Sequence, residues 1–160
     1  MGRKIECFVW IKYNRIASTV RSKQKMKVFI TASFKEGKNK DEIERLCLLV
    51  KNSGFTDFCF IRDVENYQKA FKDSKELMER AREEINKCDV LLFDATEKST
   101  SRAIEVGIAY SLRKKIIVIM KEGTVIKDTV QGVADAIIEY REIEDIQVTL
   151  EKLFIKWKSH

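Results

Sequence analysis

The stretch from Lys87 to Lys121 reads KCDVLLFDATEKSTSRAIEVGIAYSLRKKIIVIMK, and it decides the fold. Its two continuous apolar runs, 90–93 and 116–120, are typical of strands buried on both faces of a parallel sheet. Between them lie a loop rich in serine, threonine and lysine and a segment with helical spacing over 102–113. A strand, a helix and a strand of this length predict a right-handed βαβ unit.

The rest of the chain continues this alternation. The patterning predicts three more strands and four more helices, with Asn39 or Asp41 capping the first helix, and Asp73 or Ser74 capping the second. The expected strands are 27–32, 58–61 and 136–140, and the expected helices follow Asn39, span 74–86 and 127–134, and end the chain at 143–158. We therefore expect a doubly wound α/β sandwich, Rossmann- or flavodoxin-like, of about five mainly parallel strands. Residues 63–72 lack a clear pattern, and Tyr67 and Phe71 are candidates to cover a cleft.

The positive charge is concentrated at the start of the chain. The net charge is +6, but residues 1–25 hold seven basic residues against one acidic residue, Glu6, whereas residues 26–160 hold 24 of each. We therefore divide the chain into a basic N-terminal extension, 1–25, and one α/β domain, 26–160, which we expect to fold without the extension. An added strand or a membrane-surface arm stays open for the extension. Nucleic acid is not an expected partner of the neutral domain.

The cysteines and the histidine give no metal-binding pattern. Cys7, Cys47, Cys59 and Cys88 are scattered without a CxxC, and His160 is the only histidine. We expect neither a zinc site nor a histidine-based triad, and no metal or cofactor. Free thiols favour the reducing cytoplasm. No apolar run approaches the roughly 18–20 residues that span a bilayer.

Polar residues gather where a ligand would bind in this fold. Ligands of α/β sheets lie at the carboxyl ends of strands and at helix N-termini. Asp94 ends one strand here, and Ser99, Ser101 and Arg102 begin the next helix. Hydroxyls, a guanidinium and free backbone N–H groups can cradle a phosphate, although a serine here is also an ordinary helix cap. Asp94 is either a group that orients a ribose or side chain, or an exposed strand-end acid. There is no GxGxxG and no P-loop.

The helix over 102–113 has two further features. Glu105 falls in its first turn, where a side chain leans back toward the cleft. A glutamate there is a candidate catalytic group, or only a partner of the helix dipole. Ala103, Gly107 and Ser111 form a stripe of small residues, which permits close approach of the sheet or of a partner's helix.

Three motifs together resemble a known family. The run Asp89–Asp94, then Ser99, then Glu105-Val-Gly-Ile-Ala109, is similar to the nucleoside 2-deoxyribosyltransferase superfamily. Within it the 2'-deoxynucleoside 5'-monophosphate N-hydrolase is the closer match, because Val28–Gly37 resembles its first strand and glycine-containing loop. Gly132-Val-Ala-Asp135 resembles a later motif of the same relative.

The resemblance implies a reaction and a set of site residues. Glu105 would be the nucleophile on C1' of the sugar, with Asp94 as a second catalytic candidate. Ser33 and Ser99 would contact the 5'-phosphate, and serine at 99, where the transferases tend to carry aspartate, favours a monophosphate substrate. Lys35, Ser101 and Arg102 are further phosphate-binding candidates. The family forms homodimers in which the neighbouring subunit reaches the phosphate, and the matching positions here are Lys127 and Thr129.

Two positions depart from the family pattern. A tyrosine that bonds the nucleophile falls on Phe29, and an aspartate falls on Ala81, one turn before Glu84, which is a candidate substitute. We expect an N-glycosidase that cleaves or transfers the base of a (deoxy)nucleoside 5'-monophosphate. The alternative is a non-catalytic nucleotide-binding or sensing domain of the same fold.

Overall fold

The computed structural model describes residues 25–159. All of the predicted basic extension except Lys25 lies outside these residues. Within them, no helix is both long enough and apolar enough to cross a membrane.

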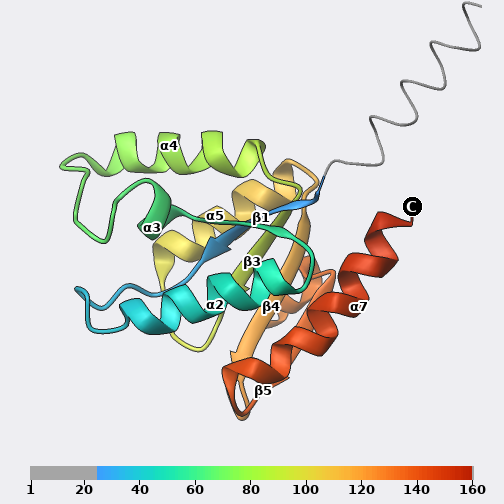
Figure 1. Cartoon of the computed structure of the whole chain (residues 1–160). Coiled ribbons are helices and arrows are strands. Elements are labelled where there is room, and N and C mark those ends of the chain that lie inside the picture. The colour runs from blue at the N-terminus through green and yellow to red at the C-terminus, as the bar shows by residue number, and fades with distance from the viewer. Residues whose placement is uncertain (1–24, 160) are drawn as a thin grey trace, which may run out of the picture.

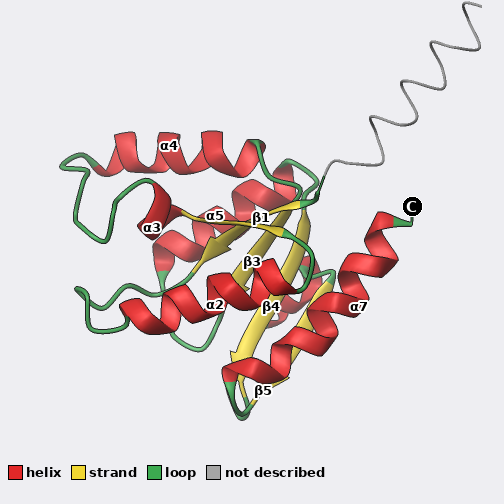
Figure 2. Cartoon of the chain, in the orientation of Figure 1, coloured by secondary structure: helices red, strands yellow, loops and turns green. Residues whose placement is uncertain are grey.

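Five parallel strands form one sheet in the order β2-β1-β3-β4-β5 (Figure 2). Their bounds are β1 Lys27–Thr31, β2 Thr56–Cys59, β3 Val90–Asp94, β4 Lys115–Lys121 and β5 Ala136–Tyr140. Every pair of neighbouring strands is parallel. This confirms the predicted α/β sandwich and its strand number.

The helices cover both faces of the sheet (Figure 1). Their bounds are α2 Lys40–Asn52, α3 Phe60–Asp63, α4 Ser74–Asn86, α5 Thr100–Ser111, α6 Asp128–Val133, the 3-10 turn η1 Ile143–Asp145 and α7 Ile146–Lys158. Helices α2 and α7 pack on one face, and α4 and α5 pack on the other. The expected cap of α4 is confirmed, because the Asp73 carboxylate accepts the N–H of Lys75 at 2.9 Å.

Alternation along the strands divides the core into two apolar layers. In β1, Val28 and Ile30 face α2 and α7, whereas Phe29 faces α4 and α5. Strand β3 repeats the pattern, since Leu92 joins the first layer and Leu91 the second. The side on which a residue lies at a strand end therefore decides which helices it meets.

Two boundaries differ from the sequence prediction. Phe60 and Ile61, expected in a strand, begin the short helix α3, because the Asp63 carboxylate accepts the N–H of Cys59 at 2.9 Å and bends the chain there. Helix α5 begins at Thr100, two residues earlier than expected. Glu105 is therefore the sixth residue of this helix and lies beyond its first turn.

The stripe of small residues on α5 does not face the sheet. Ala103, Gly107 and Ser111 are exposed, and a Cβ added at Gly107 would meet nothing within 4 Å. The expected approach to the sheet is therefore wrong, and the approach of a partner's helix stays a prediction.

Gly54 lies between α2 and β2, next to the final helix, and gives a stability prediction. It has a φ of +102°, and an added Cβ would lie 2.7 Å from the ring of Phe154 on α7. We expect Gly54→Ala to lower the free energy of unfolding by about 2–5 kcal/mol, since a left-handed backbone and a clash add. Urea denaturation measures this loss.

Gly37 supplies the matched control. Its φ is +87°, but an added Cβ would meet nothing within 4 Å. Gly37→Ala should therefore cost only the backbone part, about 1–2 kcal/mol. Equal losses for the two variants would show that Phe154 moves aside without cost.

Candidate active site

The site lies where the chain leaves β1 and β3 in opposite directions. Strand β1 leads to α2 on one face, and β3 leads to α5 on the other, so the two connecting loops separate at the carboxyl edge of the sheet. A crevice at such a switch point is where ligands of this fold bind. Two cavities, of about 270 Å³ and about 310 Å³, open there, and Ala32, Ser33 and Arg102 line both.

The smaller cavity contains Glu105, and we call it the Glu105 cavity. It combines predicted site residues with apolar side chains from α3, α4 and the loop after β1. Its lining residues are Ile30, Thr31, Ala32, Ser33, Phe34, Phe60, Ile61, Glu65, Leu77, Ser99, Ser101, Arg102 and Glu105. The structure thus brings together five of the predicted residues, namely the three serines, Arg102 and Glu105. Tyr67 and Phe71 do not line it and pack instead behind Phe34 and Phe60, respectively.

Glu105 is a buried carboxylate with one hydroxyl donor. Its residue exposure is 7%, and its carboxylate accepts a hydrogen bond from the Thr31 hydroxyl. Burial raises the pKa of Glu105 to about 7, against the opposing effects of the Thr31 bond and the Arg102 charge. The negative charge of Glu65 raises that pKa further. Stabilisation of the charge by the start of the helix, expected from the sequence, is weak because Glu105 lies past the first turn.

Thr31 is a site residue that the sequence analysis missed. It lies two positions after Phe29, so both side chains point to the same face of the sheet. Phe29 itself is fully buried, packs against Phe58 and Phe60 and does not line the cavity, whereas Thr31 does. One feature of the sequence could have identified Thr31. It places a hydroxyl at the carboxyl end of β1, on the same face as Phe29, which stands where the resembling family has a tyrosine.

The hydrogen bond from Thr31 gives a testable prediction about the pKa of Glu105. We expect Thr31→Val, which removes only the hydroxyl, to raise the pKa of Glu105 above 7, because the ionised form loses a donor worth about 1.5–3 kcal/mol. Titration of the carboxyl carbon by NMR measures it. Thr31→Ser keeps the hydroxyl and should leave the titration nearly unchanged. An unmoved pKa in the valine variant would show that the hydroxyl does not control Glu105.

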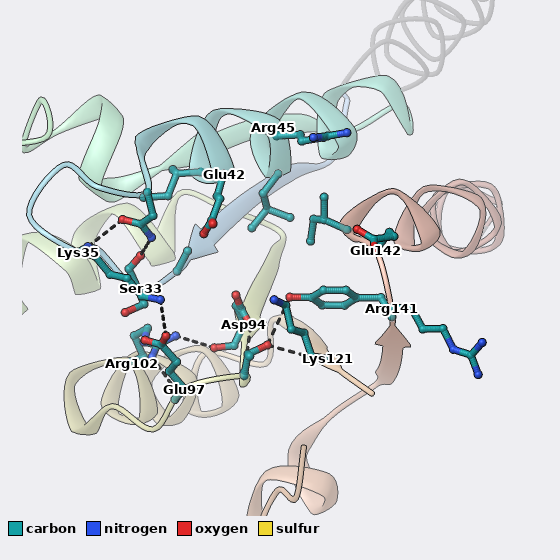
Figure 3. Close-up of a pocket in the computed structure, with 17 residues that line it drawn as sticks. Ser33, Lys35, Glu42, Arg45, Asp94, Glu97, Arg102, Lys121, Arg141 and Glu142 are labelled. Carbon is teal, nitrogen blue, oxygen red and sulfur yellow. Dashed lines mark hydrogen bonds and ion pairs between the residues drawn. The ribbon is translucent and has the colours of Figure 1, made fainter. Parts of the chain in front are cut away.

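Arg102 hydrogen-bonds the backbone of the loop after β3. It is buried, and its guanidinium donates to the backbone carbonyls of Asp94 at 2.6 Å and Glu97 at 2.7 Å (Figure 3). A side chain of α5 therefore holds the loop in place. The remaining N–H groups stay available to a ligand, since a guanidinium carries five.

Asn39 likewise hydrogen-bonds the backbone of the loop after β1. Expected from the sequence as a helix cap, it makes no side-chain cap bond. Its amide instead donates to the carbonyl of Ser33 at 2.6 Å and accepts the N–H of Lys35 at 2.8 Å. Both loops of the crevice are thus fixed by buried polar side chains.

The larger cavity lies on the α2 and α7 side, and its lining is charged (Figure 3). Lys35, Asp94, Glu97 and Lys121 contribute to it. The Asp94 carboxylate accepts the N–H of Thr96 at 3.0 Å, as a strand-end acid does. The structure therefore does not bring Asp94 together with Glu105, because the two line different cavities.

The Glu97 carboxylate lies among predicted phosphate contacts. It pairs with the Lys35 ammonium at 2.6 Å, and the Ser33 side chain lies near enough to help lower its pKa. These contacts, with the nearby charge of Arg102, hold the pKa of Glu97 below its usual value. Three groups that we expected to receive a phosphate therefore already face an anion of the protein itself. No pattern in the sequence predicts this arrangement.

Other expected positions fall outside both cavities. Lys127 and Thr129, at the start of α6, line neither. Ala81 is fully buried in the core. Glu84 does not replace the missing aspartate, since it is paired with Arg80 at 3.0 Å and Lys87 at 2.9 Å near the far end of α4.

No protein-family model matches this sequence, and no curated protein matches it either. Solved structures do resemble it. A CMP N-glycosidase from Clostridium botulinum, BcmB, has a TM-score of 0.58 and 24% identity, covering 81% of this chain and 98% of that one. A 2-deoxyribosyltransferase from Bacillus psychrosaccharolyticus has a TM-score of 0.59 and 17% identity, with coverage of 78% and 95%.

The same fold also carries unrelated activities. The signal receiver domain of a LuxO repressor protein from Vibrio parahaemolyticus has a TM-score of 0.52 and 13% identity, covering 85% of this chain and 94% of that one. These similarities establish the fold. Function must be argued from the residues of the site.

Proposed function

We propose that this protein is an N-glycosidase that cleaves or transfers the base of a (deoxy)nucleoside 5'-monophosphate, with Glu105 as the nucleophile. The observation that carries the proposal is the Glu105 cavity, where one buried carboxylate faces the serines at the start of α5 and at the end of β1. The structural similarity to a CMP N-glycosidase and a 2-deoxyribosyltransferase supports this class of reaction.

The proposed reaction has two steps. The Glu105 carboxylate attacks C1', a C1'–O bond forms, the C1'–N bond breaks, and the base leaves with a proton. Water, or a second base, then attacks C1' and releases Glu105. Ser33, Ser99 and Ser101 would hold the 5'-phosphate at the helix start, which fixes the sugar above Glu105.

Incubation with a panel of ribo- and deoxyribonucleoside 5'-monophosphates tests the proposal. Chromatography of the products should show free base from at least one nucleotide, and added free base of another kind distinguishes transfer from hydrolysis. Release of no base from any of them would favour the non-catalytic nucleotide-binding domain. The fully buried, apolar Phe29 and Ala81, at positions where the resembling family carries polar groups, are the observation in favour of that second function.

We also propose a homodimer that uses the exposed face of α5. Beside the small-residue stripe, Ile104 is 48% exposed and Tyr110 59% exposed. A partner helix packed there would bury both. Lys127 and Thr129, which line neither of the two cavities at the crevice, would then be the residues contributed to the neighbouring phosphate site.

Glu97 gives a prediction about affinity. Because its carboxylate competes with a phosphate for Ser33 and Lys35, we expect Glu97→Gln to bind a nucleoside 5'-monophosphate about two- to fivefold more tightly. Isothermal titration calorimetry measures this change. Glu36→Gln, in the same loop as Lys35, is the charge-matched control and should bind as the wild type does. Weaker binding by Glu97→Gln would show instead that Glu97 orders Lys35 for the ligand.

A further inference from the structure

Glu65 shares the Glu105 cavity and has a defined position in it. It follows α3 in a closed turn, where its N–H bonds the carbonyl of Phe60 at 3.1 Å and its carbonyl accepts the N–H of Gln68 at 2.9 Å. The next two residues, Asn66 and Tyr67, have positive φ values of 49° and 57° and reverse the chain. The turn therefore presents Glu65 from the side of the cavity formed by α3, whereas Glu105 comes from α5.

The surroundings of the Glu65 carboxyl are apolar. Phe60, Ile61 and Leu77 line the cavity with it, and burial raises the pKa of Glu65 above its usual value. Within residues 25–159, no hydrogen bond or ion pair of its side chain is formed. A half-buried carboxyl without a partner contributes nothing to stability and disfavours its own charge. Its presence in this cavity therefore needs a chemical reason.

Glu65 and Glu105 face one cavity but differ in their partners. Two carboxyls that interact titrate as a pair, and the first charge opposes the second. Thr31 donates to Glu105, and Arg102, the other charged side chain lining the cavity, also favours an ionised Glu105. The Glu65 side chain has no hydrogen-bond or ion-pair partner among residues 25–159. Glu105 therefore has two partners that favour its ionised form, whereas Glu65 has none.

Cleavage of the glycosidic bond requires both forms. Glu105 must be ionised to attack C1', so it cannot supply the proton that the departing base needs. We infer that Glu65 is the general acid that protonates the base as the C1'–N bond breaks, an assignment that rests on the proposed N-glycosidase function. The proton moves from the Glu65 carboxyl to a base nitrogen. The Glu65 carboxylate then takes a proton from the water that attacks C1' and frees Glu105, which restores the starting state.

Two substrates with different leaving groups distinguish a general acid from a residue that only shapes the cavity. A nucleoside 5'-monophosphate needs protonation of its base, whereas the 4-nitrophenyl deoxyriboside 5-phosphate releases a phenolate that leaves without a proton. We expect Glu65→Gln to slow release of the base by about 10²- to 10⁴-fold and release of nitrophenolate by no more than a few-fold. Glu79→Gln, an exposed glutamate on α4, is the matched control.

Each outcome is decisive. Equal slowing with both substrates would show that Glu65 only shapes the cavity, and no slowing with either would remove it from the reaction. Both results overturn the assignment and leave the proposed function standing. A wild type that releases neither base nor nitrophenolate overturns the proposed function and the assignment with it. Circular dichroism should show that Glu65→Gln is folded and no less stable than the wild type, because its carboxyl has no partner to lose.

Discussion

Replacement of Glu105 by glutamine should lower turnover of the nucleotide substrate by a factor of about 10⁴ and leave nucleotide affinity within a few-fold of the wild type. The amide has the shape of the carboxyl but cannot form the glycosyl-enzyme. Binding survives because the serines that would hold the phosphate are separate residues of the same cavity. Single-turnover measurement of base release, together with calorimetric binding, separates the two quantities.

The pH dependence has opposite signs for activity and for stability. Because burial raises the pKa of Glu105 to about 7, turnover should rise with pH through that value as the nucleophile loses its proton. Stability should change the other way. Between the usual glutamate value of 4.5 and about 7, the folded chain binds more protons than the unfolded chain. The contribution of Glu105 to stability therefore falls as pH rises through this window and is constant above it.

Controls identify Glu105 as the source of both effects. Glu105→Gln should show neither the rise in turnover nor this part of the stability change. Azide, a small external nucleophile, should restore base release in Glu105→Ala by occupying the space of the missing side chain. Near-normal turnover by Glu105→Ala without azide would reduce Glu105 to a structural residue and remove the proposed mechanism.

Removal of the 5'-phosphate from the ligand should weaken binding by at least about 100-fold. Charge-assisted hydrogen bonds contribute roughly 1.5–3 kcal/mol each, and Ser33, Ser99 and Ser101 all line the cavity beside the free N–H groups of α5. Calorimetry with a nucleoside and its 5'-monophosphate, on the inactive Glu105→Gln protein, measures the ratio without turnover.

A serine variant localises that effect. Ser101→Ala removes one hydroxyl, while the helix cap formed by Ser99 stays. The affinity for the monophosphate should therefore fall toward that for the nucleoside, and the affinity for the nucleoside should not change. If the wild type binds the nucleoside and the monophosphate with equal affinity, these serines do not form a phosphate-binding site.

The sheet could be predicted almost completely from hydrophobic runs. Strands β3 and β4 have unbroken apolar segments that are buried on both faces, so composition and length suffice for them. The Phe58–Ile61 run was misassigned because a short aromatic and β-branched segment is compatible with either a strand or a helix. What bends the chain is the Asp63 side chain, which lies outside the run.

The site could be predicted only in part, because its key contacts depend on side-chain direction and on distant residues. Ser33 and Ser99 were found because they lie next to predictable element ends, and Glu105 because its motif resembles that of a known family. The bond from Thr31 to Glu105 joins residues 74 positions apart, and no local pattern contains it. Asp94 was grouped with Glu105 from its place at a strand end, but alternation along β3 turns it toward the other cavity. Glu65 belongs to a segment without a recognisable pattern.

The position of β1 between β2 and β3 has a consequence for the order in which the site is built during synthesis. Strand β1 gains its second neighbour only after β3 has been made, about 60 residues later along the chain, and the Glu105 cavity also needs α5. A ribosome-bound chain that ends before α5 thus contains three of the five strands of the sheet but no cavity. A bound ligand would consequently stabilise the assembled domain as a whole, since no single segment carries enough of the site to be stabilised by itself.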